Sequence, residues 1–80
     1  MRITNNLARL RLKAGYGTIA LAAEAAGISR VHMVGFENAS QAVSQSVIER
    51  IAALYSVPVS VLVAEREKTA RLRERLRRMA

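Results

Sequence analysis

The sequence contains no cysteine, no tryptophan, one histidine and one proline. Without cysteine, the chain can form neither a disulfide nor a thiolate metal site, which fits a reducing cytosol. A lone histidine without cysteine neighbours does not make a metal site either. Aromatic residues account for only 4% of the 80 residues. A core must therefore be built from leucine, isoleucine, valine and alanine, which suits packed helices.

Long apolar runs and the usual motifs of enzymes are also missing. No stretch reaches the ~20 apolar residues of a membrane span, and the N-terminus has no apolar run long enough for a signal peptide. The sequence shows no nucleophile–base pair, no paired carboxylates, no glycine-rich phosphate loop and no cluster of metal ligands. We therefore expect a small cytoplasmic protein that is not an enzyme and has no catalytic residue, cofactor or metal.

Acidic residues are fewer than basic ones. Thirteen lysines and arginines stand against six acidic residues, which gives a formal net charge of +7. Four basic residues without an acidic one precede residue 14, and seven basic residues face three acidic ones from Glu65 onward. A basic surface built from both ends predicts a polyanionic partner, nucleic acid first and an anionic membrane surface second. The alternative is that the charge serves solubility alone.

The stretch over residues 27–38 reads as a tight turn followed by a short helix. Its opening glycine supplies a backbone that turns sharply, and Ser29 can cap the first helical turn. Met33 and Phe36 recur at helical spacing and should face a core, which leaves the first turn open. An alanine-rich helix over residues 18–26 precedes this stretch. A helix, a glycine turn and a second helix with an exposed first turn form the shape of a helix-turn-helix.

The flanking segments carry further helical signals. A first helix begins near Asn5 or Asn6 and ends at the glycine turn over 15–17. A fourth helix begins after Ser44 and carries apolar residues at i, i+4 and i+7. Pro58 is tolerated in the first turn of a fifth helix.

The last segment, residues 64–80, contains nothing that breaks a helix. Leu72, Leu76 and Met79 form one apolar stripe on it. The segment is a continuation of the fifth helix, a dimer seam or a frayed tail, and the sequence leaves these alternatives open. We divide the chain into a helix-turn-helix domain over 1–63 and a basic helical extension or tail over 64–80.

In this order, the signals resemble the Cro and lambda-repressor-like helix-turn-helix domains, also called the XRE family. The residues that carry the resemblance are Arg11 four residues before Gly15, Gly27-Ile28-Ser29, Glu37, Ser44, and Ile51-Ala52-x-Leu54-Tyr55-x-Val57 before Leu62. The resemblance implies an all-α, five-helix lambda-repressor-like domain, here with a basic C-terminal helical extension, whose second and third helices read DNA. It also implies a structural ion pair between Arg11 and Glu37 that locks the reading helix in place.

Three departures from the family pattern concern DNA reading more than the fold. Thr18 or Ile19 stands where members of the family often have a glutamine that touches a phosphate. The reading helix is unusually apolar, since Val31, Val34 and Gly35 occupy positions that are often polar. The loop after this helix has no lysine or arginine, although members usually carry one there.

The candidate DNA-binding residues surround the reading helix. Candidates for base reading are Arg30, Val31, His32, Val34 and Gly35. Arg30 suits a guanine edge and Val31 a thymine methyl, although both can also be plain surface residues. Candidates for DNA-backbone contacts are Arg2, Arg9, Lys13, Thr18, Ser29, Asn38, Ser40 and Gln41. Candidates for a dimer surface are Val59, Val61, Val63, Leu72, Leu76 and Met79.

The leading hypothesis is a sequence-specific regulator of transcription, prokaryotic or phage-type, that binds double-stranded operator DNA as a homodimer through residues 29–38. It would repress by covering the operator or control a mobile element, acting at the nucleoid without a membrane partner. The alternative is a protein-interaction module on the same fold, antitoxin-like or anti-activator-like, whose apolar face docks a protein partner. A third hypothesis is non-specific binding of nucleic acid or a membrane surface by the basic tail.

Overall fold

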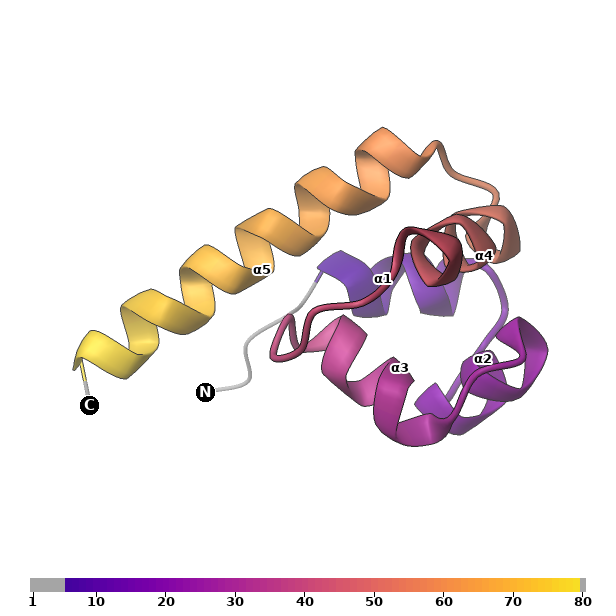
Figure 1. Ribbon diagram of the computed structural model, residues 1–80, viewed down its shortest axis with the longest axis horizontal. Coiled ribbons are helices and arrows are strands. Elements are labelled where there is room, and N and C mark those ends of the chain that lie inside the picture. Colours follow the sequence, from indigo (N-terminus) through magenta and orange to yellow (C-terminus); the bar gives the residue numbers. More distant parts are fainter. Residues whose placement is uncertain (1–5, 80) are drawn as a thin grey trace.

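Five α-helices joined by short loops make up the structure, a computed structural model that describes residues 6–79 (Figure 1). The helices are α1 (Asn6–Lys13), α2 (Ile19–Ala26), α3 (Arg30–Glu37), α4 (Gln45–Tyr55) and α5 (Val59–Met79). No strand occurs among these described residues. The prediction of an all-α fold with five helices is confirmed.

Hydroxyl caps fix the starts of α2, α3 and α4, and the cap of α3 is the one that the sequence predicts at Ser29. Thr18, Ser29 and Ser44 precede these helices, and each side-chain oxygen accepts a hydrogen bond from the backbone N–H three residues later. Such caps satisfy N–H groups that have no partner within the helix. Gly27 ends α2 in the left-handed region with φ 71°, which glycine adopts without strain.

α2 and α3 have the arrangement of a helix-turn-helix. The chain bends by 113° between them, within the range of about 90–120° that is typical of the motif. The two helices pack closely because Ala22, Ala23 and Ala26, all buried, add little bulk to the surface of α2.

The core lies between the first four helices and is closed by the start of α5. Its largest fully buried side chains are Leu7 of α1, Met33 and Phe36 of α3, Ile51 of α4 and Leu62 of α5. Burying a side chain of this size stabilises a fold by about 1.5–3 kcal/mol relative to leaving it exposed. Met33 and Phe36 therefore face the core, as their spacing predicts, and orient the opposite face of α3 outward.

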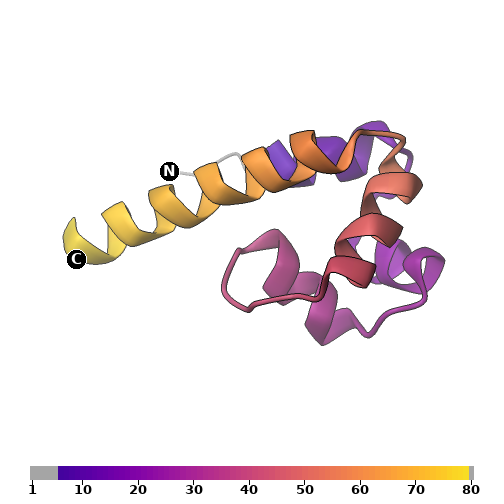
Figure 2. The same cartoon turned by 45° about the horizontal axis from the view of Figure 1, so that its top comes forward.

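α5 has a packed half and a projecting half. Leu62 is buried in the core, and Asn6 of α1 donates a hydrogen bond to the Glu65 carboxylate at 2.6 Å. Every residue over 70–79 is exposed, and Figures 1 and 2 show this half extending past the other helices. The helix is continuous through residues 63 and 64, so the predicted extension is a continuation of the fifth helix.

No single helix in the described part of the chain is both long and apolar enough to cross a membrane. Two sharply bent pairs, α2 with α3 and α4 with α5, meet the requirement by length and composition alone. The mostly buried helices of a folded core meet the same requirement.

Candidate nucleic-acid interface

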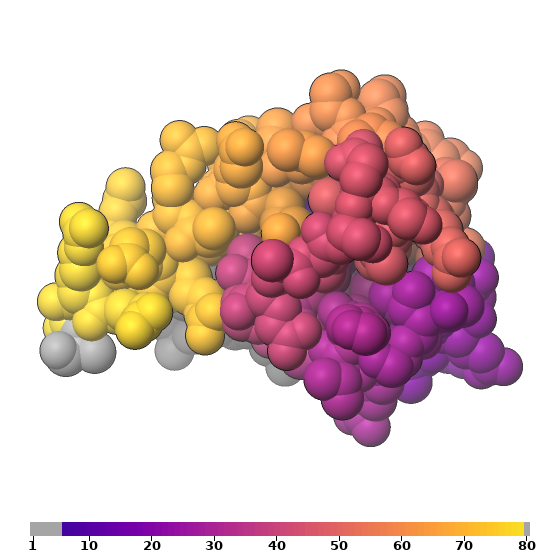
Figure 3. Space-filling view, viewed as in Figure 1, coloured from indigo at the N-terminus to yellow at the C-terminus, as the bar shows by residue number. Residues whose placement is uncertain are grey.

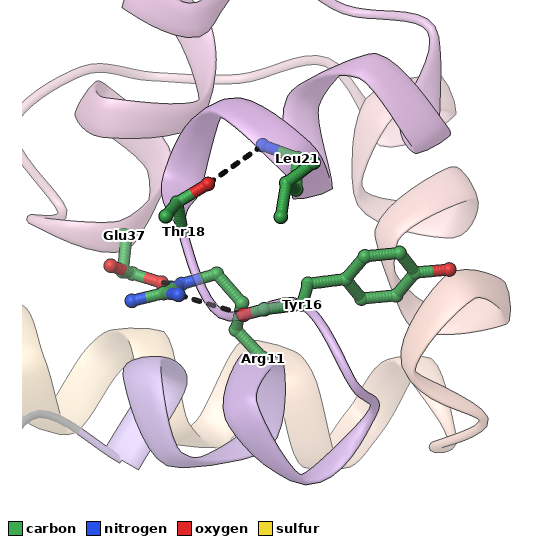
Figure 4. A network of polar contacts seen from close by, with 5 residues as sticks. All are labelled: Arg11, Tyr16, Thr18, Leu21 and Glu37. Carbon is green, nitrogen blue, oxygen red and sulfur yellow. Dashed lines mark hydrogen bonds and ion pairs between the residues drawn. The ribbon is translucent and has the colours of Figure 1, made fainter.

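A buried ion pair fixes the C-terminal end of α3. Arg11 Nε of α1 donates to Glu37 Oε1 at 2.9 Å, and the two residues are only 8% and 6% exposed. Arg11 Nη1 also donates to the backbone oxygen of Tyr16 at 2.8 Å, so one guanidinium joins α1, the α1–α2 turn and α3 (Figure 4). The pair that the family resemblance implies is thus present, in surroundings where removing one partner is strongly destabilising.

Tyr55, at the end of α4, is coupled to this pair. Its ring contacts that of Tyr16 with the centroids 6.5 Å apart. Its hydroxyl is buried and has no hydrogen-bond partner in the described part of the chain. Burial, and to a smaller extent the negative charge of Glu37, raise the pKa of Tyr55 to about 12. Tyr55 is therefore protonated and uncharged in the folded protein at neutral pH.

The chain leaves α3 through a tight backbone turn. Ala39 lies in the left-handed region with φ 54°, which is uncommon for a residue with a Cβ. The N–H groups of Ala39 and Ser40 donate to the backbone oxygens of Phe36 and Gly35 at 3.1 and 3.0 Å. The α3–α4 loop, residues 38–44, is therefore folded back against the helix that it follows.

Arg66 of α5 binds the same region from another side. Its Nε donates to the backbone oxygen of Phe36 at 3.2 Å, and its Nη2 donates to the backbone oxygen of Gln41. Its guanidinium also lies 5.4 Å from the centroid of the Phe36 ring, a cation–π contact. Partial burial lowers the pKa of Arg66 from its ordinary value. Figure 3 shows the α3–α4 loop directly against the first half of α5.

Sequence reasoning counted Arg66 only as one charge of a basic tail. The signal that could have separated it from the other tail cations is its position four residues after Leu62, on the same face of the helix. Because Leu62 is fully buried, that face points into the domain. Arg66 therefore serves the fold, whereas the cations over 68–78 are exposed.

The first turn of α3 is open. Arg30, Val31 and His32 are exposed, and Val31 keeps 67% of its surface accessible. Ser29 Oγ lies 3.1 Å from the backbone nitrogen of His32 and 3.0 Å from its ring Nδ1. Three of the predicted base-reading residues thus lie together on a surface that a ligand can reach.

The other two predicted base-reading residues lie in a groove between α3 and the α3–α4 loop. This α3 groove has a volume of about 330 Å³ and is lined by Arg30, Val31, Val34, Gly35, Ser40 and Gln41. Val34 is half-buried, and Gly35 is buried because the Gln41 side chain lies over it. The Gln41 side chain thus stands between Gly35 and the open groove, and the base contact of Gly35 stays a prediction.

The predicted DNA-backbone residues do not all lie around this groove. Those exposed at the starts of α2 and α3 and in the α3–α4 loop are Thr18, Ser29, Asn38, Ser40 and Gln41. Lys13 instead lines a separate hollow beside the end of α4, and Arg9 is exposed on α1. Arg2 lies outside the described residues.

The predicted dimer residues also separate into two sets. Val59 packs against the core, and Val63 lines a hollow together with Ile48 and Arg66, so the chain itself partly covers both. The exposed members are Val61, Leu72, Leu76 and Met79. These four are the ones that remain accessible to a partner.

Comparison with known protein families agrees with this geometry. A family model described as a helix-turn-helix domain matches residues 3–65, which is most of the chain. No curated protein and no solved structure matches the sequence.

Proposed function

Since the chain belongs to the helix-turn-helix domains of the Cro and lambda-repressor type, a DNA-binding family, we propose that it regulates transcription by binding operator DNA sequence-specifically. The observation that supports this proposal most is the way in which the rest of the domain holds α3. Arg11 and Arg66 hold its C-terminal end, while its first turn is exposed. A helix held in this way can enter the major groove by its N-terminal turn without first having to be ordered.

We assign the roles on DNA by side-chain chemistry. Arg30 donates two hydrogen bonds to a guanine edge, which is worth ~1–3 kcal/mol of discrimination. Val31 packs on a thymine methyl, and His32 bonds a base edge or a phosphate. Phosphate contacts come from Thr18, Ser29, Asn38, Ser40, Arg9 and Lys13, with Arg2 added from the N-terminal residues.

The same proposal includes a homodimer that represses by covering its operator. One copy contacts few base pairs, whereas two copies place their α3 helices in half-sites about 34 Å apart. Residues 1–63 would bind DNA, and the extension over 64–80 would pair through the exposed stripe of Leu72, Leu76 and Met79. Lys68, Arg71 and Arg75 line a hollow with Leu72. Pairing should therefore strengthen as salt screens the repulsion between these cations.

Sedimentation velocity of the full chain at two salt concentrations tests the dimer. We expect a dimer at micromolar concentration that is favoured by salt, and a monomer after Leu76→Asp. The matched control is Leu21→Asp, because Leu21 is exposed on α2, away from the stripe. A monomeric wild type at both salt concentrations would contradict the dimer.

Fluorescence anisotropy tests DNA reading. The full chain is titrated onto the duplex upstream of its own gene and onto a shuffled duplex of the same composition, at two salt concentrations. A specific regulator should prefer the native duplex by ~10³ or more. Equal and steeply salt-dependent binding to both duplexes would mean contact with backbone charge alone and would contradict the proposal for this DNA.

A protein-interaction module is the second candidate, favoured by the high exposure of Val31 beside the valine-lined α3 groove. An exposed apolar patch of this kind also suits a protein partner. The two candidates differ in which side chain matters. Arg30→Ala should impair DNA discrimination in the regulator, whereas Val31→Asp should abolish partner binding in the module while DNA is ignored.

A further inference from the structure

Gln41 occupies a special position on the reading helix. It belongs to the α3–α4 loop, yet its side chain lies across α3 at Gly35. A Cβ added at Gly35 would stand 2.7 Å from Gln41 Oε1, 2.8 Å from its Cδ and 2.9 Å from its Cγ. These separations are too short for real contacts, so any larger residue at position 35 displaces the Gln41 side chain. Glycine inside a helix is unfavourable relative to alanine, and the fold accepts it here where Gln41 crosses.

Hydrogen bonds also hold the backbone of Gln41 in place. Arg66 donates to the Gln41 carbonyl, and the same guanidinium donates to the Phe36 carbonyl at the end of α3. The turn at Ala39 and the bond from the Ser40 N–H bring the loop back onto α3. The position of Gln41 relative to α3 is therefore set by this turn together with α5, a helix outside the reading unit.

The Gln41 amide remains available to a ligand. The residue is exposed, it lines the α3 groove, and no hydrogen bond engages its side-chain amide among residues 6–79. The same groove is lined by Val31 and Val34. An amide that can donate and accept thus lies next to valine methyl groups, at the edge of the exposed first turn.

This combination matches one kind of base pair. In the major groove, adenine presents an acceptor and a donor that pair with a glutamine amide through two hydrogen bonds, and thymine presents a methyl group that packs on apolar side chains. A G·C pair offers no methyl group for the valines. The chemistry of the α3 groove therefore suits an A·T pair.

We propose that Gln41 is a specificity-determining residue that reads an A·T pair from the α3–α4 loop, and that Arg66 of α5 is the residue that positions it. This inference rests on the proposed function, since it names one base pair of the operator and the groups that read it. It changes the predicted role of Gln41 from a DNA-backbone contact to a base contact. Gly35 acts here through the space that it leaves rather than through a contact of its own.

Selection of duplexes from a randomised library by the full chain tests the base contact. The wild type should enrich a motif that contains an A·T preference, and Gln41→Ala should lose that preference at one position per half-site while keeping the rest. Gln45→Ala is the matched control, because it removes an exposed amide that does not line the α3 groove. An unchanged motif with Gln41→Ala would overturn the inference but leave the proposed function standing. A wild type that enriches no motif would overturn both.

Gly35→Ala tests the same contact without removing the amide. The added Cβ should push Gln41 off α3 and weaken the same A·T preference at least fivefold, while thermal stability is kept or raised by the better helix former. A preference that survives Gly35→Ala, in a variant that is folded by circular dichroism, would contradict the placement of Gln41 across residue 35.

Arg66→Lys tests the positioning role. Lysine keeps the positive charge but lacks the planar fork that binds two carbonyl groups at once. A positioning residue predicts loss of the A·T preference at the position defined by Gln41→Ala, with the preferences from the first turn of α3 retained. A merely structural role predicts weaker binding at all positions equally, which would overturn the assignment. Arg73→Lys, on the projecting half of α5, is the matched control and should leave the motif unchanged.

Discussion

The two ends of α3 are held in different ways. At its C-terminal end, Arg11 of α1 and Arg66 of α5 bind it with side chains that come from distant parts of the sequence. At its N-terminal end it has the Ser29 cap, and Arg30 and Val31 are exposed. Stability and recognition are therefore placed at opposite ends of an eight-residue helix. Loss of Arg11 at the first end should lower the free energy of unfolding, and changes at the second end should alter DNA binding.

Arg11→Met should have the largest effect. It leaves Glu37 as a buried carboxylate without its arginine, which should lower the free energy of unfolding by about 3–5 kcal/mol. Urea unfolding followed by circular dichroism measures the loss. Arg9→Met, at an exposed position of the same helix, should change stability by no more than about 0.5 kcal/mol.

A double variant shows whether the ion pair itself causes this loss. Arg11→Met together with Glu37→Leu replaces both charges by apolar side chains, and well-packed replacements of this kind are often neutral. The double variant should therefore recover most of the stability that Arg11→Met removes. A double variant as unstable as the single one would mean that packing, not the charge left behind, fixes the C-terminal end.

Arg30→Ala changes the N-terminal end of α3 instead. It should reduce the preference for the operator over a shuffled duplex by ~1–3 kcal/mol through loss of a guanine contact. Stability should stay within about 0.5 kcal/mol of the wild type because the side chain is exposed. Anisotropy measures the preference, and Arg73→Ala, which removes an exposed arginine from the extension, should leave the preference unchanged. An equal loss on both duplexes with Arg30→Ala would instead assign Arg30 to the phosphates.

Ser29→Ala should affect both properties, since this residue caps the helix and contacts His32. Loss of the cap should cost about 1 kcal/mol of stability. Ser44→Ala removes the same kind of cap from α4 and should cost a similar amount. Only Ser29→Ala should also weaken operator binding. Equal operator affinity for the two variants would show that the cap matters for stability alone.

The sequence predicted the helices well because their signals act over a few residues. A cap such as Ser29 acts on an N–H three residues away, and the spacing of Met33 and Phe36 shows directly which face of α3 is buried. The contacts of Arg66 could not be predicted in this way. Its partners Phe36 and Gln41 lie 30 and 25 residues earlier, a separation that no local pattern encodes.

Gly35 shows the same limit within the candidate site. Glycine in a helix indicates that something approaches the backbone closely, and from the sequence we expected DNA. The structure places the Gln41 side chain there, six residues further along the chain. The glycine therefore indicated that some group lies close to the backbone of α3. Which group it is depends on how the α3–α4 loop folds back.

Tyr55→Phe tests the region around the C-terminal end of α3 by a change that should raise stability instead of lowering it. The variant removes a buried hydroxyl that has no hydrogen-bond partner among the described residues. Stability at neutral pH should therefore rise by about 1 kcal/mol. Operator affinity should not change, because Tyr55 is buried against Tyr16 and does not belong to the exposed first turn of α3.

The same variant should alter the response to alkaline pH. The pKa of Tyr55 is about 12 in the folded state, above the value of ~10 that an unfolded chain has. Ionisation of Tyr55 therefore does not affect stability below pH ~10, and it lowers the free energy of unfolding as the pH rises toward 12, because the unfolded chain loses this proton first. Urea midpoints across this window should fall more steeply for the wild type than for Tyr55→Phe, while Tyr16→Phe, which retains Tyr55, should follow the wild type. Parallel slopes for the wild type and Tyr55→Phe would mean that water reaches the hydroxyl in the folded state, and that the end of α4 is more open than its burial indicates.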